Sequence, residues 1–170
     1  ASEGWRVASQ LAQAGVPVIA SALNDLPATF ELLGATQSNI GRMKDAGVKV
    51  AIGMINDRDS HQLRYTTQYA GNLVSLQRVP RASGLTWDEA FAAISSAPAE
   101  ILGFGDRLGS LKAGKAGDVV VWDGDPLELT SSPTHVLIDG IEQPLGNRQD
   151  RLRDRYRTPQ EGNLPKAYEH

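Results

Sequence analysis

The hydrophobic positions in the first half of the chain alternate between helix-like and strand-like spacing. Residues 2–15 place an apolar side chain at every third or fourth position, as an amphipathic helix does, and Gly15 can end that helix. Residues 16–20 are then continuously apolar; a second helical stretch, 36–47, leads to another short and largely apolar run at 48–53. Short apolar strands separated by helices are typical of a parallel sheet covered on both faces. The pattern therefore predicts neighbouring parallel strands at 16–20 and 48–53, in βαβ order.

The sharpest helix signal comes later in the chain. Thr86 and Glu89 have the spacing of a capping box, in which each side chain accepts from the other residue's backbone N–H. Apolar residues then follow at helical spacing. We expect this helix to break at Pro98 and to add one final turn before Gly103.

The pattern changes to short strands in the last third of the chain. Residues 119–122 form an apolar run that is entered and left through turns, and residues 134–138 form another. Asp139 and Gly140 follow, and Asp-Gly is a favoured hairpin dipeptide. We expect the chain to return as a short strand over 141–144.

Composition sets limits on this picture. At 170 residues the chain can form one domain with a core, but a complete eight-stranded α/β barrel takes about 250 residues. A net charge of −3 gives no electrostatic reason to expect nucleic acid or a membrane surface as a partner, and no run of about 18 apolar residues exists. The absence of cysteine excludes disulfides and thiolate metal sites. We expect a soluble protein, with the cytoplasm and the periplasm equally compatible.

Several segments, taken in order and spacing, carry a family resemblance. They are GVPVI (15–19), DAGVKVAIG (45–53), GLTWDEA (84–90), AISSAPA (93–99) with Leu102-Gly103, GSLKAGKAGDVVVWDGDPLEL (109–129) and VLIDG (136–140). Together they resemble the C-terminal portion of the metal-dependent amidohydrolase superfamily, in its imidazolonepropionase-like or prolidase-like branch. The segment 109–129 carries most of the likeness, because a similar glycine- and lysine-containing turn followed by a strand leads the chain of such enzymes from the barrel into a small β-sandwich.

This resemblance implies an α/β fold with three parts. Residues 1–108 would be the last strands and helices of a (β/α)₈ TIM-like barrel, and residues 109–147 part of a small β-sandwich. Residues 148–170 would be a polar, arginine-rich tail. The barrel before its seventh strand would be a missing N-terminal portion.

The resemblance also implies a chemistry. Such enzymes hydrolyse amide-type C–N bonds with a metal-activated water, here in a small cyclic amide or dipeptide-like substrate. Their divalent metal, with zinc the expected ion, is held mainly by histidines of the earlier barrel strands. This chain has three histidines, His61, His135 and His170, and none forms a His-x-His pair. We therefore expect no metal ligands and no bound metal in this chain alone.

One active-site element of the family falls within the chain, and here the sequence departs from the pattern. The family places a catalytic aspartate directly after the eighth strand, in a Gly-Thr-Asp sequence, but residues 53–55 read Gly-Met-Ile. Asp57 and Asp59 follow shortly, so either is a candidate for the catalytic base, and His61 is a candidate for binding substrate. The alternative is that these polar residues only form a loop.

Two other interpretations of the whole chain stay open. In the first, the chain is a non-catalytic fragment or degenerate homologue that acts as a structural module or forms a homo-oligomer through an exposed barrel edge. The unpaired strand at such an edge can form backbone hydrogen bonds with a strand of another chain. The other is a complete small α/β protein whose likeness to the family is accidental.

The remaining conspicuous residues have simpler interpretations. Asp118 is expected to be a turn and strand-entry residue, and Asp123 and Asp125 to form a turn rather than a cation site. The tryptophans are expected to be packing anchors. The arginines after Asn147 are expected to lie in a solvated segment or to form salt bridges with the acidic body; they are Arg148, Arg151, Arg153, Arg155 and Arg157.

Overall fold

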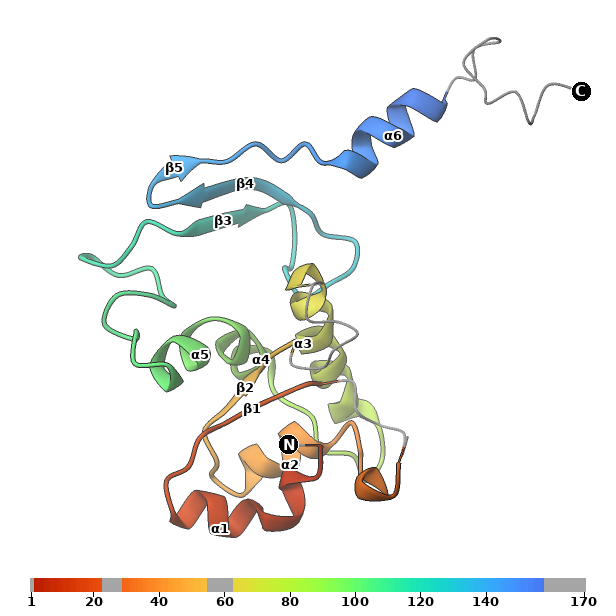
Figure 1. Ribbon diagram of the computed structural model, residues 1–170, viewed down its shortest axis with the longest axis vertical. Coiled ribbons are helices and arrows are strands. Elements are labelled where there is room, and N and C mark those ends of the chain that lie inside the picture. The colour runs from red at the N-terminus through yellow and green to blue at the C-terminus, as the bar shows by residue number, and fades with distance from the viewer. Residues whose placement is uncertain (1, 23–28, 55–62, 158–170) are drawn as a thin grey trace, which may run out of the picture.

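The computed structural model describes residues 2–22, 29–54 and 63–157. Figure 1 shows helices grouped around two short strands, an antiparallel sheet beyond them, and a last helix beyond that sheet. Along the chain the elements are η1 (Gly4–Val7), α1 (Ala8–Gln13), β1 (Val18–Ala20), η2 (Phe30–Leu32), α2 (Asn39–Asp45), β2 (Val50–Ile52), η3 (Leu63–Tyr65), α3 (Thr66–Ser75), η4 (Leu76–Arg78), α4 (Trp87–Ile94), α5 (Ser96–Ile101), β3 (Val119–Trp122), β4 (Pro133–Ile138), β5 (Ile141–Glu142) and α6 (Arg148–Arg157), where η marks a 3-10 helix.

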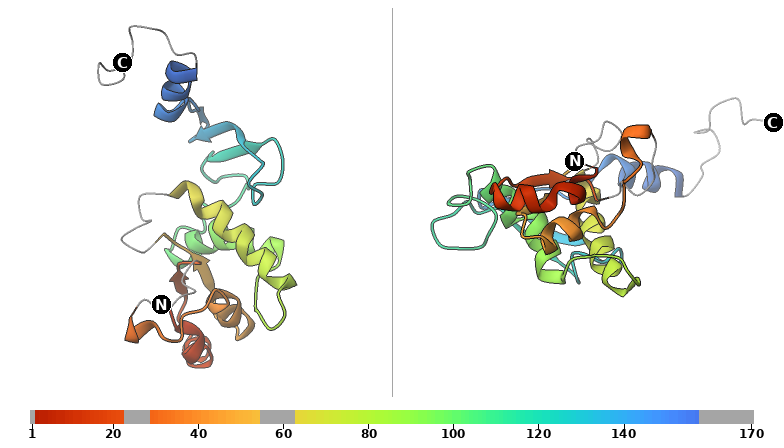
Figure 2. Two further views of the ribbon diagram at one scale, coloured as in Figure 1. Left: turned by 90° about the vertical axis from the view of Figure 1, so that its right-hand side faces the viewer. Right: turned by 90° about the horizontal axis from the view of Figure 1, so that it is seen from below.

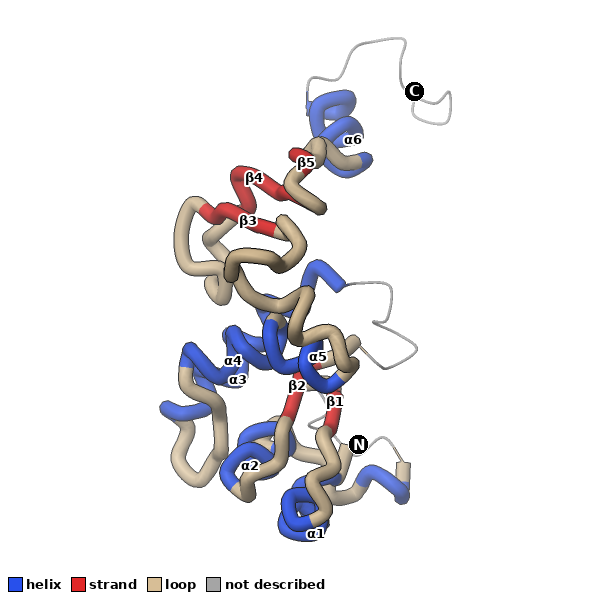
Figure 3. Tube along the Cα trace, turned by 90° about the vertical axis from the view of Figure 1, so that its left-hand side faces the viewer, coloured by secondary structure: helices blue, strands red, loops and turns tan. Residues whose placement is uncertain are grey.

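The two short strands β1 and β2 are parallel neighbours, as the sequence predicts. Val18 lies opposite Val50, and the strands run side by side between the helices (Figure 3). The Val18 N–H donates to the Lys49 carbonyl (2.9 Å) and the Gly53 N–H to the Ala20 carbonyl (3.0 Å). Both strands are therefore in register, and their carboxyl ends meet at the same edge of the sheet.

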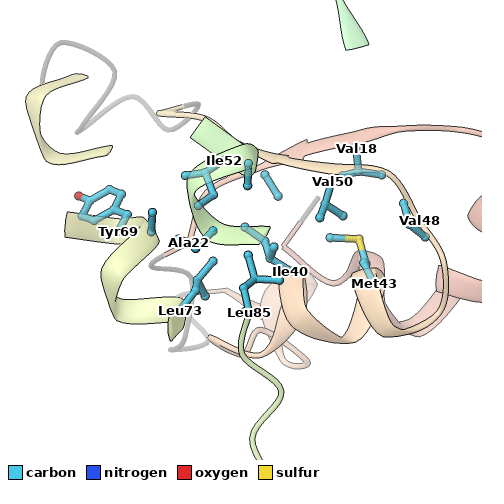
Figure 4. Close-up of a cluster of buried hydrophobic side chains, with 14 of the residues drawn as sticks. Val18, Ala22, Ile40, Met43, Val48, Val50, Ile52, Tyr69, Leu73 and Leu85 are labelled. Atoms are coloured by element: carbon cyan, nitrogen blue, oxygen red, sulfur yellow. The ribbon is translucent and has the colours of Figure 1, made fainter. Parts of the chain in front are cut away.

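The core lies between this strand pair and helices α2, α3 and α4. Ile40, Met43, Leu73 and Leu85 are almost completely buried, and side chains of both strands complete the cluster (Figure 4). Burial of each such side chain stabilises the fold by about 1.5–3 kcal/mol. The apolar spacing that predicted the helices therefore identifies the faces that pack on the strands.

The N-terminal helices are fastened to the loop that follows η2. The Trp5 indole donates to the Gly34 carbonyl (2.8 Å), and the Gly34 N–H donates to the Glu3 carboxylate (2.6 Å). This bond, with help from Arg6, lowers the pKa of Glu3. The Arg42 guanidinium lies 4.6 Å from the centre of the Trp5 ring. Trp5 is therefore a packing anchor, as expected.

The capping box at Thr86 and Glu89 is present, but the predicted break at Pro98 is wrong. Helix α4 ends at Ile94 and the irregular residue is Ser95, whose hydroxyl donates back to the Phe91 carbonyl (2.6 Å). Pro98 lies in the first turn of α5, where backbone N–H groups have no helical partner, so proline costs little there. The Ser95 hydroxyl competes with backbone N–H groups for the last carbonyls of α4, which explains why the helix breaks before Pro98.

Glu89 gives the fold a pH dependence. The Thr86 N–H and the Lys44 ammonium, 3.1 Å away, hold the pKa of the Glu89 carboxyl below its usual range. A lowered folded-state pKa means that this stabilisation is present at neutral pH and is lost as the pH falls through that pKa. We expect the melting temperature to fall less steeply on acidification in Glu89→Gln than in the unaltered chain.

Thermal unfolding followed by circular dichroism, between about pH 7 and pH 3, checks this prediction. Asp88→Asn is the matched control, because it removes the neighbouring carboxylate, which has no ion-pair partner among the described residues. If the melting temperature falls equally steeply with decreasing pH in Glu89→Gln and in the unaltered chain, this pH dependence does not come from Glu89.

Strands β3, β4 and β5 form an antiparallel sheet in the order β3-β4-β5. The predicted Asp-Gly hairpin is confirmed: Asp139 and Gly140 both have positive φ angles, 52° and 76°. The Asp118 carboxylate accepts the Asp139 N–H (2.8 Å). Asp118 therefore lies at the entry to β3, as predicted, and its carboxylate binds the hairpin turn between β4 and β5.

The segment between α5 and β3 is fastened by the lysine of its glycine-rich turn. The Lys115 ammonium donates to the carbonyls of Gly105 (2.6 Å) and Leu108 (3.3 Å). Gly109 and Gly114 take positive φ angles, 83° and 85°, that other residues rarely adopt. The lysine and glycines of this sequence motif therefore have a structural role.

The loop after β3 connects the antiparallel sheet to the helices. The Trp87 indole donates to the Asp125 carboxylate (2.9 Å and 3.0 Å to its two oxygens), and the Trp87 ring stacks on Phe91. Leu127 is buried in the core, and its carbonyl approaches Gly71 so closely that a Cβ there would lie 2.2 Å away. Asp125 is therefore a structural residue, as the turn interpretation implies.

Helix α6 occupies the first part of the segment predicted to be a polar tail. Asn147 and Asp150 begin it by accepting each other's backbone N–H (3.0 Å and 3.3 Å). Arg153 pairs with Asp150 (3.5 Å) and with Asp154 (3.2 Å). Within the described residues the ion pairs of these arginines are therefore local, rather than with the acidic body.

No helix among the described residues combines the length and the apolar character needed to cross a membrane.

Candidate functional site

The edge where β1 and β2 end is the candidate functional site. Ser21 and Ala22 follow β1, Gly53 and Met54 follow β2, and all but the partly exposed Gly53 are buried. In α/β barrels, catalytic groups lie at the carboxyl ends of the strands because the loops after the strands converge there. The parallel register places these four residues at that edge.

Helix α3 adds Tyr69 to this edge. Tyr69 is buried and lies at the end of the core cluster that holds Ile52 and Ala22, opposite the end that holds Val48 (Figure 4). The sequence did not single out this tyrosine. The available signal was its helical spacing, since Tyr69, Ala70 and Leu73 are the buried residues of α3.

The predicted catalytic residues lie just beyond this edge in the sequence. Asp57, Asp59 and His61 belong to segment 55–62, which is outside the described residues. Met54, the last described residue before them, comes two positions after the end of β2. Their roles therefore stay predictions.

The other predicted polar residues are accounted for by local structure. The Asp123 carboxylate accepts the Ser132 N–H (2.7 Å). His135 lies on the exposed surface of β4, with its Nδ1 2.7 Å from the Glu142 carboxylate. Within residues 2–22, 29–54 and 63–157, no three His, Asp or Glu side chains come together in a way that could hold a metal ion.

A cavity of about 400 Å³ lies at the opposite edge of the strand pair. It is lined by the amino end of β2 and by side chains of α2 and α4, among them Lys44 and Glu89. Nearby, Lys49 and Glu100 form an ion pair (2.5 Å), and Lys49 lowers the pKa of the Glu100 carboxyl. The Lys44–Glu89 pair therefore joins α2 to α4, and the Lys49–Glu100 pair joins the start of β2 to α5. Because the cavity is at the amino ends of the strands, it is not the expected position of a barrel active site.

The comparisons with known proteins agree on one family. The model of a family described as "Amidohydrolase family" matches residues 5–141. Amidohydrolase tasK of Hapsidospora irregularis is 50% identical over 60 residues, which are 35% of this chain and 6% of that protein. Imidazolonepropionase of Mesorhizobium japonicum is 28% identical over 119 residues, which are 66% of this chain and 28% of that protein.

A solved structure agrees with these sequence relatives. The crystal structure of an amidohydrolase from Thermotoga maritima MSB8 superposes with a TM-score of 0.71 at 29% identity, over 83% of this chain and 34% of that one. The chain thus spans about a third or less of the length of these proteins. Its order of elements, its parallel strand pair and these matches lead to one conclusion: the chain belongs to the amidohydrolase family.

Proposed function

We propose that the chain is the C-terminal portion of a metal-dependent amidohydrolase that hydrolyses an amide-type C–N bond in a small cyclic amide or dipeptide-like substrate. Residues 1–108 are then the last part of the (β/α)₈ barrel, residues 109–147 part of the β-sandwich, and residues 148–170 an arginine-rich extension. The observation that carries the proposal is the parallel β1–β2 pair, whose carboxyl ends meet at one edge, with the candidate catalytic residues in the segment that follows β2.

In this proposal the chain contributes a base rather than the metal ligands. The divalent metal, with zinc the expected ion, is in this proposal held mainly by histidines of the earlier barrel strands, as the family resemblance implies; within residues 2–22, 29–54 and 63–157 no three His, Asp or Glu side chains come together to hold one. Such a metal, when bound, would lower the pKa of a water so that hydroxide forms at neutral pH and can attack a carbonyl carbon. The carboxylate of Asp57 or Asp59 would accept the proton of the attacking water, and His61 would orient the substrate.

The number of zinc ions bound per purified chain tests whether this chain supplies the base but not the metal ligands. After dialysis against trace zinc, elemental analysis is expected to find far less than one zinc per chain, because the described residues offer no three-ligand set. About one tightly held zinc per chain would contradict the proposal. Repeating the measurement with His61→Ala and with Asp57→Asn would then show whether residues 55–62 hold that metal.

One observation favours a second function, that of a self-associating or structural module. The hydrogen bonds of Val18 and Ala20 are directed at β2, so the N–H and C=O of Ile19 point to the other side of β1. Within the described residues no strand pairs with that outer edge. Activity in a longer chain that contains this one would exclude the purely structural interpretation.

A further inference from the structure

The connection between β3 and β4 is a loop with joined ends, residues 123–132, which we name the connecting loop. At its base the Asp123 N–H donates to the Ser132 carbonyl (3.1 Å), and the Ser132 N–H donates to the Asp123 carboxylate (2.7 Å). Within the loop the Asp125 carboxylate accepts the Leu127 N–H (2.9 Å). A loop whose ends are joined and whose interior is hydrogen-bonded keeps its shape. The antiparallel sheet therefore presents Leu127 on a preformed unit.

The connecting loop turns from the sheet toward α3 (Figures 1 and 2). Leu127 is only 6% exposed and belongs to the buried cluster that includes side chains of α3. A Cβ at Gly71 would clash with the Leu127 carbonyl oxygen, so a glycine is needed for this close approach. The loop is also fixed to α4, because the Asp125 carboxylate accepts the Trp87 indole N–H. The connecting loop therefore holds α3 from the side of the sheet.

Helix α3 also contacts the strand pair, on another of its faces. Tyr69 lies about 200° around the helix from Gly71, since successive residues are about 100° apart. It is buried at the end of the core cluster that holds Ile52, the last residue of β2 (Figure 4). At this edge the Gly53 N–H donates to the Ala20 carbonyl (3.0 Å) and joins the ends of the two strands. A path of direct contacts thus leads from the connecting loop through α3 to the carboxyl edge.

The amino edge of the strand pair is held by different contacts. The Val48 N–H donates to the Met43 carbonyl of α2 (3.0 Å), and the Val18 N–H donates to the Lys49 carbonyl (2.9 Å). Met43 and Val48 lie at the end of the core cluster opposite Tyr69 (Figure 4). The two edges of one strand pair are therefore held by separate parts of the chain.

We propose that Leu127 is a positioning residue for the carboxyl edge, which the connecting loop holds in place through α3 and Tyr69. The inference rests on the proposed function, because that function makes this edge the place where the C–N bond is hydrolysed. It extends that function by giving the antiparallel sheet a part in the geometry of the site. Leu127 acts through α3 and contacts no substrate.

Hydrogen exchange at two amides of the strand pair tests the proposal. The Gly53 N–H reports on the carboxyl edge and the Val18 N–H on the amino edge. In Leu127→Ala, NMR on the full chain is expected to show the ratio of the Gly53 to the Val18 exchange rate raised by about tenfold or more, because the carboxyl edge opens locally. Met43→Ala is the matched control, since it also shortens a buried core side chain but at the amino edge. It is expected to leave that ratio unchanged or to lower it.

Two further variants complete this test. Asp125→Ala alters an exposed side chain, so it keeps the test open if Leu127→Ala fails to fold. It removes the acceptor for the Trp87 and Leu127 N–H groups and is expected to raise the exchange ratio by about threefold. Leu127→Met keeps the buried volume and is expected to stay within about twofold of the unaltered chain.

If neither Leu127→Ala nor Asp125→Ala raises the ratio, or if Met43→Ala raises it equally, the proposal is overturned. Exchange rates require no substrate, so this failure is distinct from failure of the proposed function. The latter would be an absence of C–N bond hydrolysis by the longer enzyme.

Discussion

In the longer enzyme of which we propose this chain is a part, replacement of the proposed catalytic base, Asp57 or Asp59, by asparagine is expected to lower kcat by about 10²–10⁴-fold. This is the usual contribution of a positioned general base, and asparagine cannot accept the proton of the attacking water. The amide keeps the size of the side chain and its ability to form hydrogen bonds, so KM is expected to change little. Steady-state kinetics on each single variant identifies the base, because only one of the two should show the full loss.

The control for this prediction is Asp45→Asn, which removes an exposed carboxylate at the end of α2, on the amino side of β2. Its kcat is expected to stay within about twofold of the unaltered enzyme, as for a surface carboxylate that no reacting proton reaches. If both Asp57→Asn and Asp59→Asn behave like this control, the base lies elsewhere. The polar residues of 55–62 would then only form a loop.

The second large effect is expected from Gly41→Ala, which adds a Cβ where α2 and the segment before α4 are in close contact. A Cβ at Gly41 would lie 2.2 Å from the Ser83 carbonyl oxygen and 2.8 Å from that of Gly84. The Ser38 hydroxyl holds the same segment by accepting the Ser83 N–H (3.0 Å), so the segment cannot simply move away. We expect a net loss of about 2 kcal/mol of unfolding free energy and a melting temperature lower by roughly 4–8 °C.

Chemical and thermal denaturation check this loss of stability. Gly146→Ala is the matched control, because a Cβ there meets no atom within 4 Å. That control is expected to change the unfolding free energy by less than about 0.5 kcal/mol. Equal stability of the two variants would show that α2 and residues 83–85 separate at little cost.

How far the sequence predicts this fold depends on whether a feature is local. The capping box at Thr86 and the Asp139-Gly140 hairpin are present because their hydrogen bonds join residues a few positions apart. The break near Pro98 was misplaced because two local signals compete there, and the Ser95 hydroxyl prevails over the proline. Helix α6 was missed since its polar composition suggested only a solvated segment, although Asn147 and Asp150 have the spacing of a cap.

The sequence by itself determined the family, the alternation of helices and strands in the first half, and the residue types from which a base could come. Those features follow from periodicity and from short motifs, which neighbouring residues satisfy among themselves. Only the tertiary structure decided that Tyr69 lies at the edge where β1 and β2 end, that Asp125 is bound to Trp87, and that α6 projects away from the acidic sheet. These features join residues far apart in the chain, and long-range packing is set by shape and burial rather than by local spacing.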